Sequence, residues 1–378
     1  MDFGFSETQR EVQQLARKIL GEQVTADKLA QYDEYAAERF DRTLWGQLAE
    51  AGLLGVAIDQ AHGGMGLGFF ELALLVEEAG RVLAPLPLVP HAVSTALAVQ
   101  AFGTEAQQAS LLPGAAEGSL LLTAALSEAT NEDPARPTAT SAVAAAGGYR
   151  LTGVKTCVPN ARSATAILAS AATPDGPVAV LVDPMADGVS FRDVHYTTYE
   201  PLVEMHLDEV LIGADGVLAG PETGAAVMQW VAEHTTAALC AHQLGVTDVA
   251  MRMTASYTAE REQFGVPVAT FQAVGHRAAN CFIDVECLRL NTYQAVSLLD
   301  AGSPATTEVQ IAKIWAGDVG HRVSYAAQHL HGGTGIDRDY PLWRYCLWAR
   351  HNEAMLGGSA RQLAALGRRI AAGEAHCR

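Results

Sequence analysis

Long helical segments in the C-terminal half constrain the fold of this chain more than any other feature. After Pro221, apolar residues recur with the helical period of about 3.6 residues. The stretches with this pattern are 223–262, 268–300, 305–330 and 342–371. Gly302-Ser303-Pro304 and a glycine-rich turn between Gly332 and Gly335 separate the last of them. Long helices joined by short connections predict a four-helix bundle over residues 223–378.

The preceding residues predict two further domains, since a chain of 378 residues exceeds what one core usually supports. Residues 1–118 have helical patterns that begin with a capping box at Ser6 and Gln9. Residues 119–222 have short Val-, Leu-, Ile- and Thr-rich runs between turns, which predict a small β-barrel or sandwich domain. We therefore expect an α+β chain with boundaries near residues 118 and 222.

Charge and composition narrow the class of protein. The chain has 25 basic and 42 acidic residues and a net charge of −17, which argues against binding nucleic acid or an anionic membrane through general charge. No apolar run reaches ~18 residues, and residues 1–5 lack the pattern of a signal peptide. We expect a cytoplasmic protein. The cysteines form no C-x-x-C pair, so buried free thiols are expected at Cys157, Cys240, Cys281, Cys287, Cys346 and Cys377.

Two segments carry groups suited to a phosphate ligand. Arg261-Glu262-Gln263-Phe264-Gly265 offers a guanidinium fork that matches two phosphate oxygens. His329-Leu330-His331-Gly332-Gly333 offers paired glycines, which let backbone N–H groups approach a phosphate. Taken alone, the first segment is also typical of a helix end with Gly265 as its C-cap. The two histidines have no carboxylate or thiolate at a matching spacing, so no metal site is expected.

The joint occurrence of these segments resembles the acyl-CoA dehydrogenase family, and the resemblance covers nearly the whole chain. Further matching segments, in the expected order, are Asp59–Gly68, Val76–Arg81, Phe102–Glu105, Leu111–Pro113, Ala125–Glu128 and Tyr149–Lys155. The resemblance implies an FAD flavoprotein that acts on acyl-CoA thioesters and passes electrons to an electron-transfer flavoprotein. It implies that the cofactor contacts Arg261, Phe264, Gln272, His329, Gly332 and Gly333. Family members usually have glutamine at position 329.

The family's catalytic glutamate has no counterpart. By the resemblance, a glutamate removes the α-proton of the substrate while a hydride passes to the flavin. At the two places where the family carries this residue, the chain has Gly357 and Thr235. Glu233 lies about half a turn from Thr235 and should point elsewhere. Glu353, one turn before Gly357, is a possible substitute base, although a solvated helix carboxylate is the simpler interpretation.

The β-domain also departs from the family pattern. The hairpin that contacts the flavin ring usually reads Lys-x-Trp-Ile-Thr, but here it reads Lys155-Thr156-Cys157-Val158-Pro159. The wide aromatic side chain is absent, and proline has no N–H to donate. Ser127-Glu128 is followed by 129–137, a polar and proline-containing stretch for which we expect an exposed loop, in place of the family's flavin and acyl loop.

By the resemblance, each FAD is shared: one subunit's β-domain holds the ring and its neighbour holds the diphosphate and adenosine. The sequence keeps the second half and has lost the first. It looks most like the base-lacking subunit of heteromeric actinobacterial steroid-CoA dehydrogenases, which implies a paralogous catalytic partner in an α2β2 assembly. One alternative is an active homotetramer that uses Glu353 or another base. A second is a non-enzymatic module that binds acyl-CoA or a partner.

Overall fold

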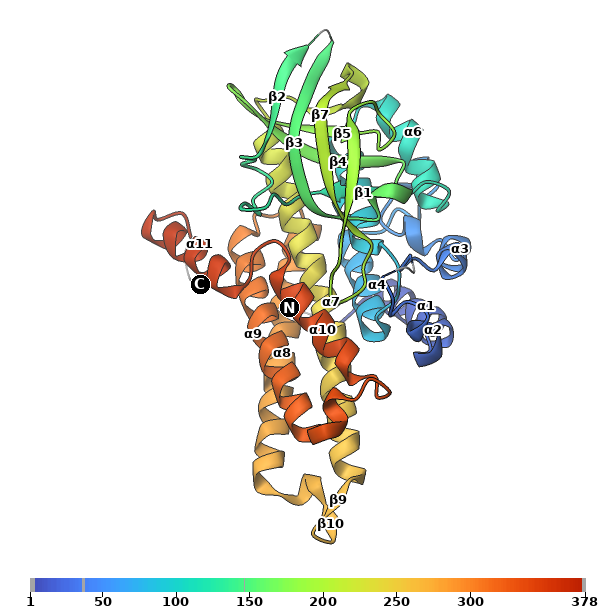
Figure 1. Cartoon of the computed structure of the whole chain (residues 1–378), viewed down its shortest axis with the longest axis vertical. Coiled ribbons are helices and arrows are strands. Elements are labelled where there is room, and N and C mark those ends of the chain that lie inside the picture. The colour runs from blue at the N-terminus through green and yellow to red at the C-terminus, as the bar shows by residue number, and fades with distance from the viewer. Residues whose placement is uncertain (1–3, 36–37, 146, 376–378) are drawn as a thin grey trace. The chain divides into compact units, whose positions relative to one another are not determined.

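The computed structural model describes residues 4–35, 38–145 and 147–375, and these form two compact units (Figure 1). One unit contains the residues up to 28, residues 73–84 and the residues from 236 onward. The other contains residues 29–72 and 85–235. This division does not test the expected boundaries near residues 118 and 222, which stay predictions. Cys377 lies outside the described residues.

The N-terminal part is helical, as its sequence pattern predicts. Ser6 and Gln9 form the expected capping box, in which each side chain accepts a hydrogen bond from the other residue's backbone N–H. The helical elements are α1 (Glu7–Gln23), α2 (Ala26–Ala30), α3 (Arg42–Glu50), η1 (Leu53–Gly55), η2 (Gln60–His62), α4 (Phe69–Val82), the π-helix η3 (Val89–Ala96), α5 (Leu97–Phe102) and α6 (Glu105–Ala116).

The middle of the chain forms a sheet, which in the described residues has eight strands. The strands are β1 (Leu122–Ala125), β2 (Thr140–Ala145), β3 (Gly148–Pro159), β4 (Ala166–Thr173), β5 (Gly176–Val182), β6 (Val189–Val194), β7 (Leu202–Ile212) and β8 (Val217–Ala219). Short helices η4 (Ala161–Ser163) and η5 (Ala214–Gly216) lie between them. The order is β6-β7-β3-β2-β4-β5-β8, and β1 pairs parallel with β4.

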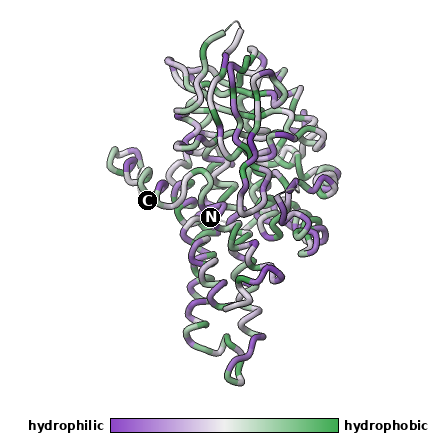
Figure 2. Tube along the Cα trace, viewed as in Figure 1, coloured by the Kyte–Doolittle hydropathy of each residue, from purple (hydrophilic) through white to green (hydrophobic). Residues whose placement is uncertain are grey.

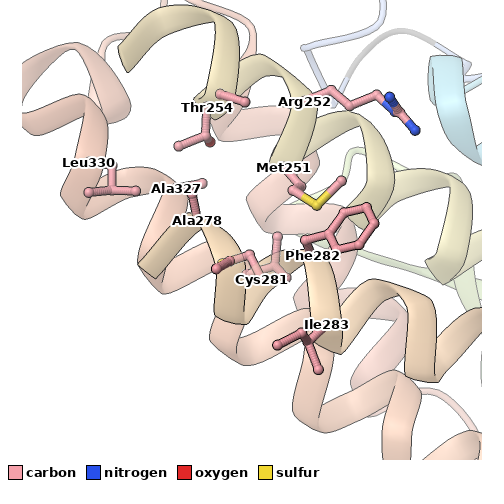
Figure 3. A pocket seen from close by; sticks show the side chains of 12 residues that line it. Met251, Arg252, Thr254, Ala278, Cys281, Phe282, Ile283, Ala327 and Leu330 are labelled. Carbon is pink, nitrogen blue, oxygen red and sulfur yellow. The ribbon is translucent and has the colours of Figure 1, made fainter. Parts of the chain in front are cut away.

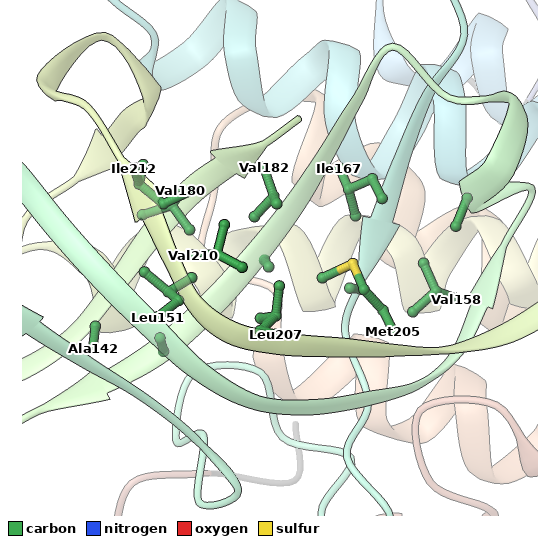
Figure 4. Close-up of a cluster of buried hydrophobic side chains, with 14 of the residues drawn as sticks. Ala142, Leu151, Val158, Ile167, Val180, Val182, Met205, Leu207, Val210 and Ile212 are labelled. Carbon is green, nitrogen blue, oxygen red and sulfur yellow. The ribbon is translucent and has the colours of Figure 1, made fainter. Parts of the chain in front are cut away.

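The sheet curves around an apolar core. Figure 4 shows Leu151 of β3, Ile167 of β4, Val180 of β5 and Met205 of β7 gathered on the same inner side of the strands. All four side chains are buried without solvent access. Alternate residues of each strand therefore supply the core, as the period of two in a β-strand requires.

The C-terminal part contains the long helices that the sequence predicts. They are α7 (Gly224–Glu260), α8 (Gln272–Asp300), α9 (Thr306–His331), α10 (Leu342–Ala354) and α11 (Ser359–Ala371). Between α7 and α8 lie β9 (Glu262–Gln263), β10 (Val266–Pro267) and η6 (Val268–Thr270), and η7 (Gly332–Ile336) follows α9. Figure 2 shows hydrophilic and hydrophobic residues intermixed along these helices. No helix in the described ranges has the length and apolar character needed to cross a bilayer.

The fourth expected helix, 342–371, is interrupted. α10 ends at Ala354 and α11 begins at Ser359. Leu356 and Gly357 between them have φ of +53° and +90°, which a right-handed helix cannot contain. The helical period continues on both sides of the break, so the pattern alone predicts one helix where the backbone forms two.

Candidate functional site

Arg261 follows α7 directly, and the next residues form a hairpin. β9 pairs antiparallel with β10. Phe264 and Gly265 make the two-residue turn, with φ of +57° and +79°. Positive values at both positions are what a type I′ hairpin turn requires. The interpretation of Gly265 as a helix C-cap is therefore wrong, because α7 already ends at Glu260.

Phe264 is held outward at the tip of this hairpin. Its residue surface is 94% exposed, and its backbone has the left-handed conformation that bulky residues rarely adopt. Among the described residues, its ring meets Phe271 edge-on, with 6.2 Å between the ring centroids. Gln272, the first residue of α8, follows Phe271 directly and is also exposed. A strained, exposed aromatic residue favours contact with a ligand or with another chain.

The guanidinium of Arg261 is available to a ligand. The backbone carbonyl of Arg261 accepts a hydrogen bond from Val268 N–H at 2.7 Å, which fixes the residue at the base of the hairpin. Its side chain is exposed and makes no hydrogen bond or ion pair with the residues that the structure describes. A donor fork that has no acceptor among the described residues suits a phosphate.

Gly332 and Gly333 leave open space where α9 ends. A Cβ atom added to either glycine would have no neighbour within 4 Å, and Gly332 has φ of +60°. The open space lets a ligand approach this backbone closely, although the Gly332 N–H itself already donates to the carbonyl oxygen of His329. Gly335 differs, because a Cβ there would lie 2.7 Å from the carbonyl oxygen of Gln328. Packing explains Gly335, whereas it does not explain Gly332 and Gly333.

Tyr257 joins the two phosphate-type segments. It lies one helical turn before Arg261, and its ring stacks on His331 with 4.3 Å between centroids. Its hydroxyl donates to the carbonyl oxygen of His331 at 3.4 Å and to Thr334 Oγ1 at 3.3 Å. The end of α7 and the glycine turn are therefore neighbours. Tyr257 could not be found from the sequence, because its partner His331 lies more than 70 residues away in the chain.

His329 is exposed on the last turn of α9, and its ring meets a second basic residue. Arg277 Nη1, on α8, lies 2.6 Å from His329 Nδ1. Arg277 also follows Gln272 by little more than one helical turn, so α8 carries both residues toward the same end of the bundle. The expected cofactor residues thus lie on connected elements, although their roles as ligands stay predictions.

This donor set fits the diphosphate and sugar part of a dinucleotide. It combines an unpaired guanidinium at Arg261, open backbone at Gly332 and Gly333, and an exposed ring at Phe264. Arg261 can donate to such a ligand and Phe264 can pack against it, while the open space at Gly332 and Gly333 leaves room for its close approach.

The loop at Gly357 provides no base. Gly357 has no side chain, and its φ of +90° would strain any other residue. A Cβ there would also lie 3.0 Å from Arg361 Cδ. Gln362 Nε2 donates to the carbonyl oxygen of Leu356 at 2.9 Å, which fixes the loop. Chemistry that needs a carboxylate at this place cannot come from this segment.

The second position for a base is filled by a hydroxyl pair. Thr235 on α7 is 5% exposed, and its Oγ1 lies 2.9 Å from Ser94 Oγ in η3. The neighbouring His234 ring stacks on Trp230 with 3.7 Å between centroids. Burial lowers the pKa of His234 to about 4, against the smaller opposing effect of its hydrogen bond to the Trp230 carbonyl. Buried hydroxyls do not replace a carboxylate base.

Glu353 is engaged in other contacts. Its carboxylate forms an ion pair with Arg350 on the same helix. Its Cγ would lie 3.2 Å from a Cβ placed on Gly317, so its stem packs closely on α9. The expectation that Glu353 lies one helical turn before Gly357 is wrong, because α10 ends at Ala354, before that position is reached.

In the sheet, Glu128 anchors the segment expected to be an exposed loop. Its carboxylate accepts hydrogen bonds from the backbone N–H groups of Thr138, Ala139 and Thr140 and from Lys155 Nζ at 2.9 Å. Burial opposes ionisation, but the hydrogen bonds from Lys155 and the backbone outweigh it and lower the pKa of Glu128 to about 2. The expectation of an exposed loop is only partly right, because Ala135 within it is 6% exposed.

The end of β3 is occupied by its own chain. Cys157 has φ of +53°, and the pairing of β3 with β7 shifts register between Lys155 and Val158. The Cys157 thiol and the Tyr196 hydroxyl are hydrogen-bonded, and burial is the main cause that raises the pKa of both groups. Pro159 pairs with Leu202 and its carbonyl oxygen accepts the Thr123 hydroxyl at 2.6 Å. The Cys157 thiol and the Pro159 carbonyl oxygen at the end of β3 are therefore already engaged in contacts within the chain.

The other expected thiols differ in burial. Cys240, Cys281 and Cys346 are buried, whereas Cys157 and Cys287 are partly exposed. Burial raises the pKa of Cys240 to about 12, so this thiol stays protonated at neutral pH. None of the cysteines in the described residues is in a disulfide.

The sequence and the structure identify the family. Residues 6–119 match the family model for the acyl-CoA dehydrogenase N-terminal domain, and residues 222–371 match the model for its C-terminal domain. The chain is 34% identical to acyl-CoA dehydrogenase FadE27 of Mycobacterium tuberculosis, over 98% of this chain and 99% of that protein. The chain therefore belongs to the acyl-CoA dehydrogenase family, whose members are FAD-dependent oxidoreductases acting on CH–CH donors.

Solved structures of similar chains include heteromeric complexes. A chain of the ChsE4-ChsE5 complex from Mycobacterium tuberculosis is 34% identical over 100% of both chains, with a TM-score of 0.93. A chain of a variant of the Tcur3481-Tcur3483 steroid ACAD is 42% identical over 98% of this chain and 99% of that chain, with a TM-score of 0.90. The α+β fold, with helical N- and C-terminal parts and a middle sheet, is thus that of the family.

Proposed function

We propose that this chain is the subunit of a hetero-oligomeric acyl-CoA dehydrogenase that completes the FAD site of a catalytic partner. It supplies the half that binds the diphosphate and adenosine. The observation that carries this proposal is the Phe264 hairpin, where an aromatic residue is exposed at the tip and the Arg261 guanidinium has no partner among the residues that the structure describes. At the end of β3, by contrast, Cys157 and Tyr196 bind each other.

The substrate class that we propose is an acyl-CoA thioester with a steroid side chain. It rests on the likeness to a chain of the Tcur3481-Tcur3483 steroid ACAD. The partner that we propose is a paralogous subunit in an α2β2 assembly, and the likeness to the ChsE4-ChsE5 complex supports it. An electron-transfer flavoprotein would accept the electrons, and the protein would work in the cytoplasm.

An apolar hollow supports the proposal that another chain covers these helices. It has a volume of about 590 Å³ and lies among α7, α8 and α9 (Figure 3). Met251, Cys281, Phe282 and Leu330 are among its lining residues. Phe282 and Ile283 are 54% and 58% exposed. A contiguous apolar patch of this kind is typical of protein interfaces.

In the proposed reaction, the residues of this chain bind and orient the cofactor. Arg261 would donate two hydrogen bonds to the diphosphate, and the backbone at Gly332 and Gly333 would approach it closely. Phe264 would cover an apolar face of the cofactor or of the partner. Bound FAD supplies the hydride acceptor, and the glutamate that removes the α-proton comes from the partner, since Gly357 and Thr235 cannot provide it.

The test is the amount of FAD per polypeptide. The chain is purified alone and again after co-expression with the nearest dehydrogenase-like protein encoded beside it. We expect no flavin in the chain alone and one FAD per pair of chains in the complex. One FAD per chain and full turnover from the chain alone would instead identify an active homomer. Absence of FAD with every candidate partner would identify a binding module.

A further inference from the structure

The contact between Arg277 and His329 determines which nitrogen of the histidine carries the proton. A guanidinium can only donate hydrogen bonds. At 2.6 Å from Arg277 Nη1, His329 Nδ1 is therefore the acceptor. A neutral imidazole that accepts through Nδ1 carries its hydrogen on Nε2. His329 thus presents a single N–H donor, on the side of the ring opposite Arg277.

Within the described part of the chain, no group accepts a hydrogen bond from this donor. His329 is exposed, and its Nε2 makes no hydrogen bond with a residue that the structure describes. It lies three residues before Gly332, at the end of α9 where the backbone is open. The Nε2–H group therefore belongs to the same surface as the proposed cofactor-binding residues.

Both side chains have fixed positions on packed helices. The Arg277 guanidinium carbon lies 5.6 Å from the centroid of the Tyr325 ring, which is one helical turn before His329. The next residue after each member of the pair, Ala278 and Leu330, lines the apolar hollow in Figure 3. The contact thus joins α8 to α9 at a place where the helices already pack against each other.

We propose that Arg277 is a positioning residue for FAD. It holds the His329 ring with Nε2–H directed toward the diphosphate and adenosine half of the cofactor. The inference rests on the proposed function. It explains how histidine can replace the glutamine that the family resemblance implies at this position: a glutamine amide always has an N–H donor, whereas a histidine needs a partner that fixes its tautomer.

The first test measures FAD affinity in the complex with the partner subunit, for the wild type and for Arg277→Gln, His329→Gln and the double variant. Loss of one oriented donor should weaken FAD binding about fivefold in Arg277→Gln. His329→Gln should bind FAD within about twofold of the wild type, and adding Arg277→Gln to it should cause no further loss. Equal losses from Arg277→Gln in both backgrounds would overturn the proposal, because Arg277 would then bind the cofactor directly.

A matched control separates this effect from loss of a cation between the same helices. Arg322→Gln removes a guanidinium that bridges α9 to Asp284 of α8 at 2.7 Å. It should leave FAD affinity unchanged. A loss equal to that of Arg277→Gln would show that both variants act through helix packing, and the proposal would fail.

The second test reads the tautomer directly. In a complex whose histidines are ¹⁵N-labelled only in this chain, the His329 signals are assigned by their absence in His329→Gln. The wild type should show the proton on Nε2, and Arg277→Gln should show a mixture of tautomers. An unchanged tautomer in Arg277→Gln would contradict the inference while leaving the proposed function intact. A wild-type complex without FAD would instead contradict the proposed function.

Discussion

The Phe264 hairpin and the end of β3 are, in the function that we propose, the retained and the lost half of a shared flavin site, and they differ in what their side chains contact. At the hairpin, Phe264 is exposed and meets Phe271 edge-on, and the Arg261 side chain has no partner among the described residues. At β3, Lys155 is bound by Glu128, and Cys157 is bound by Tyr196. Exposed polar groups are satisfied by water and remain available to a ligand, whereas buried polar groups must find partners within the fold.

This difference distinguishes a chain that has lost its cofactor from a chain that shares the cofactor with a partner subunit. A chain that had lost its cofactor altogether would have no physical reason to keep a strained, exposed aromatic residue at φ of +57°. The comparison therefore predicts that changes at β3 affect folding and leave FAD in the complex, and that changes at the hairpin do the opposite.

The largest expected effect is on folding, from Lys155→Met. Lys155 and Glu128 have side chains that are 1% and 2% exposed, so the variant leaves a buried carboxylate without its cation. We expect the free energy of unfolding to fall by about 3–5 kcal/mol, measured by denaturant unfolding. Adding Glu128→Gln should restore part of the loss. Release of FAD from the complex at temperatures where Lys155→Met is still folded would contradict the claim that β3 of this chain affects folding and not cofactor binding.

Acid should also destabilise the unit that contains the sheet, through His91. Its Nδ1 accepts the Leu122 N–H at 3.1 Å, and its Nε2 lies 3.2 Å from the Ala115 carbonyl oxygen. Burial lowers the pKa of His91 to about 4, against the smaller effect of the bond to Ala115. Below pH ~6.5 the His91 imidazole takes up a proton in the unfolded chain but stays neutral in the folded chain. The free energy of unfolding therefore falls as the pH drops toward 4.

The histidine contribution to this loss is about 3 kcal/mol between neutral pH and pH 4. Thermal unfolding of the wild type and of His91→Gln, measured at several pH values, checks it. Glutamine can keep both a donor and an acceptor but does not titrate in this range, so the variant should lose less stability on acidification. Parallel pH profiles for the two proteins would show that His91 does not cause the acid sensitivity.

At the hairpin, Arg261→Ala should affect the cofactor and not the fold. A charge-assisted hydrogen bond contributes about 1.5–3 kcal/mol, so FAD affinity of the complex should fall by roughly 10- to 100-fold. The FAD affinity of Arg261→Lys should lie between those of the wild type and Arg261→Ala, because lysine keeps the charge but lacks the two-donor guanidinium. The unfolding temperature should be unchanged, since Arg261 has no side-chain partner among the described residues. Normal FAD affinity in Arg261→Ala would remove the hairpin from the site.

Local sequence patterns predicted the positions of the helices better than the turns that connect them. The helical period and the capping box at Ser6 were sufficient to place the helices, because both signals lie within one segment. The break at Leu356 and Gly357 was missed although Gly357-Gly358 is a turn signal, because the helical period continues on both sides of it. The hairpin at Gly265 was not predicted: a helix C-cap was the expected alternative, because a glycine suits both a helix end and a type I′ turn.

The sequence could name candidate site residues whose chemistry alone suggests a role, but not residues whose role depends on a contact in the folded chain. Arginine and paired glycines indicate phosphate binding by their chemistry, which is why Arg261, Gly332 and Gly333 could be named. Arg277 gave no signal, because its partner His329 is 52 residues away in the chain. Glu128 was quoted only as part of a family motif, and its role in anchoring the following loop appears only in the folded structure.

The smallest expected effect is that of Glu353→Gln on turnover by the complex. Glu353 forms an ion pair with Arg350, and its side chain is 24% exposed. The variant removes a partly exposed ion pair, which contributes about 0–1 kcal/mol to stability, and it removes no group that the proposed reaction uses. We therefore expect steady-state turnover within about twofold of the wild type. Arg350→Gln, which breaks the same ion pair and keeps the carboxylate, is the matched control. If Glu353 were the base, Glu353→Gln would lower turnover by a factor of about 10²–10⁴ while Arg350→Gln would not, and the missing glutamate would then be present in this chain after all.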